Sequence, residues 1–404
     1  MCDRPMQRTR PDFTPEQLQI AWAQSRDNTR DPGRPGIDRL SAAMFAAELP
    51  ENLAVMSRRI RRGEYNFSPL YPAFIRKKSG RLRLICVPTV RDRLIQRAIK
   101  VYLEDKDRLD LSNTISYGFL RGRGVVAAIA QACALRQSAP FAVKVDITAF
   151  FDSIDRDRLY DIINRRVGSR RVRELLRGVV GMEVLAQSRT AKRQLKDVGV
   201  KRGTGLRQGM PLSPLLSNLY LKRFDQDVAK DGVPAVRYAD DILAFGRSYG
   251  EAEEIFDRVR SALMLFDLNL PDLGDGDKAS VICGPRESVE YLGMDIRATG
   301  SGEFRPCVPK RKLEQVIADL EEIASVAVCV ANRQTLGTVS RSLDSIVAGL
   351  EGAMRHAYGY DRFIARVVRA KEAAIAKLVS ELIGPVAFDS LTDDGKRVLG
   401  LAPF

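Results

Sequence analysis

The chain has 404 residues, and its 65 lysines and arginines outnumber its 51 aspartates and glutamates, which gives a net charge of +14. A chain of this length forms more than one simple core, so we expect two or three subdomains. The basic charge favours a polyanionic partner such as nucleic acid, and the single histidine, His356, excludes a Cys2His2 zinc finger, a histidine-rich zinc hydrolase and an HNH nuclease.

The six cysteines are scattered without a CxxC pair, which predicts free thiols in a reducing compartment. The sequence contains no apolar run of the roughly 18 residues that a membrane span needs. The N-terminal stretch MCDRPMQRTRPDF carries charges where a signal peptide needs an apolar core. We therefore expect a cytoplasmic protein with no membrane segment.

The first third of the chain mixes helical and extended patterns. A short helical lead-in around residues 21–25 runs into the turn-rich stretch RDPGRPG. Residues 68–90 predict two extended segments joined at Ser79 and Gly80, with a basic tip. An amphipathic helix is predicted at residues 91–107 and another helix at 122–137.

The middle of the chain carries the acidic residues of interest. Residues 141–147 predict a short strand that ends on Asp146, and a helical pattern follows at 155–167. The basic, glycine-punctuated stretch 188–205 predicts a solvated loop, with direct nucleic-acid contact as the alternative. The next helix is expected at 213–230, where Ser213 caps the free amides and Pro214 takes the first helical position.

A hairpin is predicted by the stretch AVRYADDILAF, residues 235–245, because two apolar runs flank Asp240 and Asp241. Beyond it we expect a helix at 249–270 and strands at 280–285 and 289–297. The pattern after Pro309 is mostly helical. A two-residue reversal would present the carboxylate of Asp240 at the hairpin tip.

An acidic turn by itself is usually structural, because aspartate is tolerated in tight turns. The strand that ends on Asp146 can neighbour the hairpin in one sheet, and carboxylates on adjacent strand ends repel each other unless a divalent cation lies between them. Mg²⁺ suits such a place, because it is bound by one or two carboxylates, waters and substrate phosphates. The three acids therefore predict a magnesium site for phosphoryl transfer.

Three segments in this order and spacing resemble the central palm motifs of reverse transcriptases of the bacterial group II intron-like and retron-like branch: VKVDITAFFDSI, GLRQGMPLSPLLSNLYL and YADD. The flanking segments IRKKSGRLRLICVPTVRDRLIQRAI and SYGFLRGRG resemble the fingers motifs of that family. The segments DGDKASVICGP and YLGMDI resemble its later palm and primer-grip motifs. The resemblance runs from about Gly36 to Ile296.

The resemblance implies an α+β right-hand polymerase with fingers, a ferredoxin-like palm and a helical thumb. The implied organisation is an N-terminal extension at residues 1–32, fingers at 33–142, a palm at 143–305 with an insertion at about 167–204, and a thumb at 306–404.

The same resemblance implies the catalytic and metal-binding residues. Asp146 and Asp240 would bind metal, Asp241 would support the site, and the backbone carbonyl of Ile147 would complete the shell of one ion. Two Mg²⁺ ions are implied, with Mn²⁺ as a possible substitute. Lys278 matches a lysine that would protonate or stabilise the departing pyrophosphate.

Nucleotide-binding residues are implied at two places. Lys77 and Arg83, with Lys78 as a further candidate, match basic fingers residues that hold the triphosphate. Gln208 and Gly209 match the loop that packs against the incoming nucleotide, where a missing side chain permits close approach. Arg207 stands where the family commonly has proline, which leaves the stiffness of this loop open.

Phe151 matches an aromatic residue that lies under the sugar and blocks a 2′-hydroxyl, so deoxynucleotides should be preferred. The alternative is that Phe150 and Phe151 are ordinary core residues.

The resemblance implies an RNA-directed DNA polymerase. Its substrates would be deoxynucleotides, its template an RNA or a structured noncoding RNA, and its product DNA. The implied setting is bacterial antiviral defence. The alternatives are a group II intron-encoded reverse transcriptase or maturase and a template-independent, defence-associated DNA polymerase. The sequence leaves the oligomeric state open.

Overall fold

The structure is a computed structural model, and it describes residues 12–28, 33–76, 80, 82–105, 108–274 and 279–398. Its contacts divide the chain into two compact units. The first unit comprises Met1–Gly124, Val143–Ala244 and Gly250–Val281, and the second comprises Val125–Ala142, Phe245–Tyr249 and Ile282–Phe404.

The N-terminal part of the first unit is a small helical layer. Helix α1 runs over Pro15–Ala23, earlier than the predicted lead-in, because Thr14 and Gln17 form a capping box at its start. Trp22 of α1 packs on Phe45, with ring centroids 5.2 Å apart. The remaining elements here are η1 (Arg26–Asn28), α2 (Ala42–Ala47) and α3 (Leu49–Arg62).

The predicted hairpin at residues 68–90 is confirmed. Strands β1 (Tyr71–Arg76) and β2 (Leu82–Val87) pair antiparallel, with Tyr71 opposite Val87 and Arg76 opposite Leu82. Helix α4 (Val90–Glu104) follows, and Thr89 caps it by accepting from the backbone amide of Asp92. This hairpin provides the basic wall of the cleft described below.

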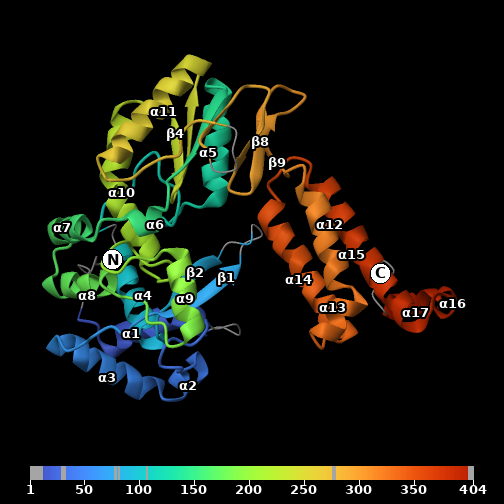
Figure 1. The fold of residues 1–404 in the computed structure, drawn as a ribbon, viewed down its shortest axis with the longest axis horizontal. Helices are drawn as coiled ribbons and strands as arrows, with labels where there is room; N and C mark the ends of the chain where they lie inside the picture. Colours follow the sequence, from blue (N-terminus) through green and yellow to red (C-terminus); the bar gives the residue numbers. More distant parts are fainter. Residues whose placement is uncertain are drawn as a thin grey trace, which may run out of the picture. The chain divides into compact units, whose positions relative to one another are not determined.

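A four-stranded sheet has the strand order β4-β5-β3-β6. Its members are β3 (Phe141–Asp146), β4 (Ala235–Tyr238), β5 (Asp241–Gly246) and β6 (Val281–Cys283). The chain includes α10 (Ser213–Lys230) between β3 and β4, and α11 (Tyr249–Met264) between β5 and β6. In Figure 1 the part from α10 to β5 is drawn in green to yellow. This order with helical connections is the ferredoxin-like βαββαβ fold, so the expected palm topology is confirmed.

The segment between β3 and α10 is helical: the helix predicted at residues 155–167 is confirmed, and only the loop predicted at 188–205 is wrong. It contains α6 (Phe150–Ser153), α7 (Arg156–Arg166), α8 (Arg170–Val180) and α9 (Arg189–Val198). Helix α9 lies in the stretch predicted as a solvated loop: Ser188 caps it, and Gly199 ends it with a left-handed φ of 77°. None of its residues is buried, so no apolar stripe marked it in the sequence.

Helix α10 also begins differently than predicted. Ser213 is its first residue rather than its cap, and no side chain caps this end. The hydroxyl of Ser213 instead donates to the carbonyl of Arg207 at 2.6 Å. The serine therefore ties the start of α10 to the preceding loop, and α11 ends at Met264, short of the predicted residue 270.

The second unit contains a three-stranded sheet of β7 (Val289–Tyr291), β8 (Met294–Ala298) and β9 (Phe304–Cys307) in that order. The predicted single strand at 289–297 is thus a hairpin, because Leu292 and Gly293 turn the chain with φ values of 51° and 81°. Arg136 of α5 (Val125–Ser138) is fully buried and donates to the carbonyl of Ile296.

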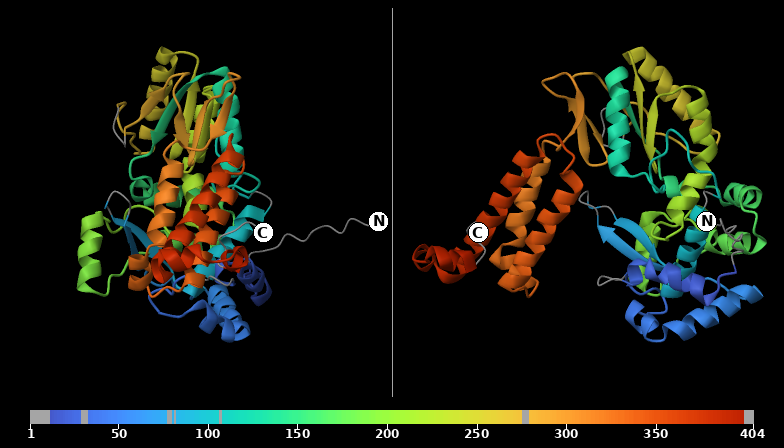
Figure 2. Two further views of the ribbon diagram at one scale, coloured as in Figure 1. Left: turned by 90° about the vertical axis from the view of Figure 1, so that its right-hand side faces the viewer. Right: turned by 180° about the vertical axis from the view of Figure 1, so that it is seen from behind.

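The helical prediction beyond residue 309 is confirmed. The helices are α12 (Lys312–Ile323), α13 (Val326–Ala331), α14 (Leu336–Met354), α15 (Tyr360–Ile383), α16 (Pro385–Asp389) and α17 (Asp393–Val398). Figure 2 shows α12, α14 and α15 as a bundle in orange to red. Leu320, Leu343 and Val367, from these three helices, are completely buried.

The mixed helices and sheets confirm the α+β class. Within the described ranges, no helix combines the length and apolar character that crossing a bilayer requires.

Candidate active site

The hairpin of β4 and β5 presents Asp240 at its tip. Tyr238 pairs with Asp241, which leaves Ala239 and Asp240 as a two-residue turn, as predicted. Ala239 has a φ of 59°, and a positive φ at the first turn residue is the pattern of a type II′ turn, where glycine is usual. A left-handed conformation costs a non-glycine residue about 1–2 kcal/mol. The surroundings must therefore hold this turn.

One surrounding group acts directly on the turn. The guanidinium of Arg237 donates from Nη1 to the carbonyl oxygen of Ala239 at 2.9 Å. A hydrogen bond from a charged donor contributes about 1.5–3 kcal/mol, which is enough to offset the left-handed backbone.

The end of β3 lies against this turn. The backbone amide of Ile147 donates to the carbonyl oxygen of Asp240 at 3.2 Å, and Asp146, the residue before Ile147, ends β3. Since β5 and β3 are neighbours in the sheet, Asp146, Asp240 and Asp241 lie at one end of it. Asp146 is exposed, and the other two are half-buried.

Burial disfavours the charged form of Asp240. Burial raises the pKa of Asp240, while its own backbone hydrogen bond and the positive charges of Arg83 and Arg237 act in the opposite direction; the net shift is upward. The ionised form of Asp240 is thus destabilised, and a bound cation would relieve this.

The donor set fits Mg²⁺. Aspartate and backbone carbonyl oxygens are the hard ligands that Mg²⁺ prefers, and one or two carboxylates suffice when waters and substrate phosphates complete the shell. Within the described ranges, no three histidine, cysteine, aspartate or glutamate side chains form a cluster that could hold a metal.

A second group of predicted residues meets on the loop before α10. The carbonyl of Gln208 accepts from the amide of Cys86 at 2.8 Å, and the side chain of Gln208 accepts from Nε of Arg83 at 3.2 Å. Gly209 has a φ of 101°, and a Cβ there would lie 2.7 Å from the carbonyl oxygen of Cys86. Only glycine fits this contact between the loop and β2.

Arg83, Phe151, Gln208 and Gly209 line one cleft of about 1070 Å³ in the first unit. Arg83 also connects this cleft electrostatically with the carboxylates, because its positive charge acts to lower the pKa of Asp240, against the upward effect of burial. Further cationic residues that were not predicted also line the cleft: Arg26, Arg34, Arg76, Arg93 and Arg97. They are dispersed along the sequence, and only the fold gathers them.

The two phenylalanines of α6 differ in their surroundings. Phe150 is 2% exposed and belongs to the core, while Phe151 is half-buried and lines the cleft. Their ring centroids are 5.3 Å apart, so Phe150 supports the ring of Phe151. Lys77, Lys78 and Lys278 lie outside the described residues.

Arg207 is anchored by its side chain. Its Nη2 donates to Glu183 and to the carbonyl of Lys201, each at 2.7 Å. The other oxygen of Glu183 accepts from Arg156 at 2.7 Å and from the amide of Gly203 at 2.8 Å. These bonds restrain the backbone next to Gln208.

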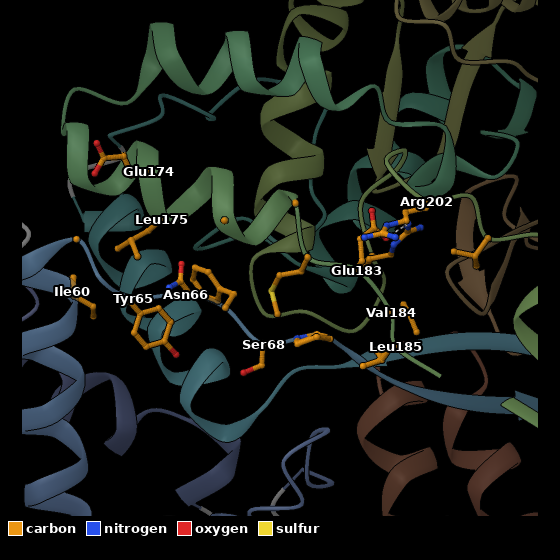
Figure 3. Close-up of a pocket in the computed structure, with 18 of the residues that line it drawn as sticks. Ile60, Tyr65, Asn66, Ser68, Glu174, Leu175, Glu183, Val184, Leu185 and Arg202 are labelled. Carbon is orange, nitrogen blue, oxygen red and sulfur yellow. Dashed lines mark hydrogen bonds and ion pairs between the residues drawn. The ribbon is translucent and has the colours of Figure 1, made fainter. Parts of the chain in front are cut away.

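Glu183 also lines a second cavity of about 730 Å³, in which Figure 3 shows Glu183 and Arg202 at one end and Ile60 and Tyr65 at the other. Burial raises the pKa of Glu183, but hydrogen bonds from Arg207 and Gly203 and the charges of Arg207 and Arg156 outweigh it and hold this pKa below its usual range. Among the predicted catalytic and nucleotide-binding residues that the structure describes, none lines this cavity.

Comparison with known proteins gives a family match over residues 75–296, to the family described as reverse transcriptase (RNA-dependent DNA polymerase). This range covers more than half of the chain, and it includes the carboxylates and the loop before α10.

Curated proteins with similar sequences support the match. Protein YkfC of Escherichia coli is 30% identical over 226 residues, which cover 54% of this chain and 55% of that protein. The group II intron-encoded protein LtrA of Lactococcus lactis is 28% identical over 179 residues, 44% of this chain and 28% of that protein. An uncharacterized 91 kDa protein in a cob intron of Schizosaccharomyces pombe is 31% identical over 163 residues, 40% of this chain and 19% of that protein.

The matched part thus spans about half the length of the first relative and less than a third of the other two.

Proposed function

Because the chain belongs to the reverse transcriptase (RNA-dependent DNA polymerase) family, we propose that it is an RNA-directed DNA polymerase. It adds deoxynucleotides to the 3′-hydroxyl of a primer that is paired with an RNA template. The observation that carries this proposal is the hydrogen bond from the amide of Ile147 to the carbonyl of Asp240, since it joins the two strand ends that bear the acidic residues.

The proposed domains are the ones expected from the sequence: fingers at residues 33–142, a palm at 143–305 with an insertion at about 167–204, and a thumb at 306–404. The ferredoxin-like sheet of β3 to β6 lies in the palm range except for the first two residues of β3, Phe141 and Ala142. The helices from α12 onward fall within the thumb range.

Asp146 and Asp240, supported by Asp241 and by the carbonyl of Ile147, would hold two Mg²⁺ ions, or Mn²⁺ in their place. When bound, such ions lower the pKa of the attacking hydroxyl and stabilise the charge of the leaving pyrophosphate. The carboxylates hold the reacting centre at the end of the sheet, where a rigid hairpin fixes their positions.

The cleft would bind the deoxynucleotide. Arg83 offers a planar fork to phosphate oxygens, and its bond to Gln208 aligns the two groups for one ligand. Gly209 lets the backbone approach the nucleotide closely. Phe151 fills the space that a 2′-hydroxyl would need. Lys77 is assigned to the triphosphate and Lys278 to the departing pyrophosphate.

A primer-extension assay tests the proposal. The protein is given an RNA template, a DNA primer, deoxynucleotides and Mg²⁺, and the variant Asp240→Ala is compared with Asp231→Ala, which removes an exposed aspartate just after α10. We expect Asp240→Ala to lose at least about 100-fold in rate and Asp231→Ala to retain activity. Full activity in folded Asp240→Ala, or no synthesis by the wild type, would overturn the proposal.

We also propose that the physiological template is a structured RNA. The setting inferred first from the sequence is antiviral defence with a noncoding RNA, and the similarity to intron-encoded proteins favours a group II intron-encoded reverse transcriptase as the second candidate. RNA that copurifies with the protein should be sequenced and compared with the neighbouring DNA. An adjacent noncoding RNA gene would support the first setting, and intron ends would support the second.

Template-independent synthesis is tested separately. Each deoxynucleotide is supplied singly, with and without the RNA template. The proposal predicts incorporation only of the nucleotide complementary to the next template base. Equal incorporation without a template would establish the untemplated alternative.

A further inference from the structure

Arg237 is completely buried beneath the hairpin turn, and all five of its N–H donors are used. It makes a bidentate pair with Asp225, from Nε at 2.6 Å and from Nη2 at 2.5 Å. The same Nη2 donates to the hydroxyl of Ser116 at 3.0 Å. Nη1 donates to the side-chain oxygen of Asn218 at 3.1 Å and to the carbonyl of Ala239 at 2.9 Å.

These acceptors come from three separate parts of the first unit. Asp225 and Asn218 are on α10, Ser116 belongs to the segment 113–119, and Ala239 is in the turn itself. The segment 113–119 also runs beside β4, because the amide of Arg237 donates to Ile115 at 2.9 Å and its carbonyl accepts from Tyr117 at 2.8 Å. One guanidinium therefore fixes the turn relative to both neighbouring segments.

The turn is enclosed from a second side by Gly118 and Phe119. A Cβ at Gly118 would lie 2.7 Å from the amide nitrogen of Ala239, and the rings of Phe119 and Tyr238 are 5.6 Å apart. Asn218 connects this side to the guanidinium, because its Nδ2 donates to the carbonyl of Gly118 at 2.7 Å. Asn218 thus bonds both to Arg237 and to the segment that covers the turn.

A buried ion pair is a weak source of net stability, because the loss of solvation offsets much of its attraction. The five hydrogen bonds that Arg237 donates instead fix the direction of the Ala239 carbonyl. Loss of the Arg237 bond would remove the charged donor that holds the left-handed backbone of Ala239. The turn would then relax, and Asp240 would move with it.

We propose that Arg237 is a positioning residue, which holds the Ala239 carbonyl and thereby aims the carboxylate of Asp240 at the same point as that of Asp146. Asp225 and Asn218 act through Arg237 as its counter-ion and its orienting amide. This inference rests on the proposed function of the carboxylates as the metal-binding end of the palm sheet.

The test uses two variants of the full chain and one matched control. Arg237→Lys keeps the charge but cannot supply five donors in a planar fork. Asn218→Ala keeps the Arg237–Asp225 pair but removes the amide that connects it to Gly118. The control is Lys222→Met, which removes another buried cation of α10, bonded to Asp110 rather than to the turn.

Three quantities separate positioning from a merely structural role: kcat and KM for the deoxynucleotide, and the Mg²⁺ concentration that gives half-maximal rate. We expect Arg237→Lys to lower kcat about 100-fold and to raise the half-saturating Mg²⁺ concentration, with KM for the nucleotide little changed. Asn218→Ala should shift the same two quantities by less. Lys222→Met should shift neither, although thermal unfolding followed by circular dichroism should register its loss of stability.

A direct metal-binding measurement makes the outcome independent of catalysis. Mn²⁺ binding to the free proteins is followed by electron paramagnetic resonance, with Asp240→Ala as the reference for a lost ligand. Weaker Mn²⁺ binding by Arg237→Lys supports the inference even if no DNA synthesis is detected, in which case only the proposed function fails.

Wild-type kcat and wild-type Mn²⁺ binding in a folded Arg237→Lys protein would overturn the inference while leaving the proposed function intact. If Arg237→Lys does not fold, Asn218→Ala decides: unchanged kcat and metal binding in that variant would equally overturn it.

Discussion

Gly118 lies so close to Ala239 that a Cβ on the glycine would come within 2.7 Å of the alanine's backbone nitrogen and within 3.3 Å of the Cα of Tyr238. The segment 113–119 and the acidic hairpin are therefore packed backbone against backbone. Two parts of the chain that lie far apart in the sequence, as the 121 residues between Ser116 and Arg237 show, jointly define where Asp240 points.

Gly118→Ala should displace the hairpin turn and sharply reduce DNA synthesis. The added methyl group would meet main-chain atoms, which cannot rotate away as a side chain can, so the turn has to shift. A displacement of about 1 Å at a catalytic group can lower the rate about 100-fold. The rate is measured by primer extension at saturating nucleotide. Gly124→Ala is the control, because a Cβ there meets nothing within 4 Å.

Gly209→Ala should impair nucleotide binding. Its φ of 101° disfavours alanine, and the new Cβ would lie 2.7 Å from the carbonyl oxygen of Cys86, which pushes the loop away from β2. We expect a higher KM for deoxynucleotides. Gly199→Ala shares the left-handed penalty, at a φ of 77°, but has open space around it. Equal KM values in the two variants would show that the close contact of Gly209 is irrelevant to the nucleotide.

Phe151→Ala should reduce the preference for deoxynucleotides over ribonucleotides, because it empties the space that excludes a 2′-hydroxyl. The discrimination ratio, measured as kcat/KM for dATP over ATP, should fall by about 10-fold to 100-fold. Phe150→Leu alters the buried neighbour in the core and should lower stability while preserving the ratio. If Phe151→Ala leaves the ratio unchanged, another residue reads the sugar.

Glu183→Gln should destabilise the protein at neutral pH by about 2 kcal/mol, because Arg156 and Arg207 lose their shared counter-ion. The folded-state pKa of Glu183 is lowered, so its stabilising effect is present above the unfolded-state value of about 4.3 and is lost as the pH falls through the folded-state value. Urea unfolding should therefore show a difference between wild type and variant at pH 7 that shrinks at about pH 3.

Glu174→Gln provides the control for that experiment. Glu174 lines the same cavity but pairs with Arg170 at the exposed surface, so its replacement should change stability by less than about 0.5 kcal/mol. A difference between wild type and Glu183→Gln that is independent of pH would show that the charge of Glu183 is not what stabilises the fold.

Local sequence pattern was sufficient to predict the elements whose signals lie within a few neighbouring residues. The alternation around Asp240 and the apolar run before Asp146 predicted the strands, and the tight turn placed Asp240 at the tip, as the pairing of Tyr238 with Asp241 confirms. Helix α9 shows the limit: with no buried residue, only its Ser188 cap and Gly199 stop could have revealed it. The start of α10 shows a second limit of local pattern. The hydroxyl of Ser213 donates to the carbonyl of Arg207 in the preceding loop rather than capping the helix.

The amino-acid pattern predicted the acidic strand ends, the basic hairpin and the order of the strands and helices around them, because periodicity and turn chemistry act over a few residues. The ferredoxin-like palm was implied by the family resemblance. The convergence of Ser116, Asn218 and Asp225 on Arg237 became visible in the folded chain alone, as did the pairing of Glu183 with Arg207. Such contacts join residues far apart in the chain. They depend on how whole elements pack, and a buried guanidinium can find its acceptors only once those elements have come together.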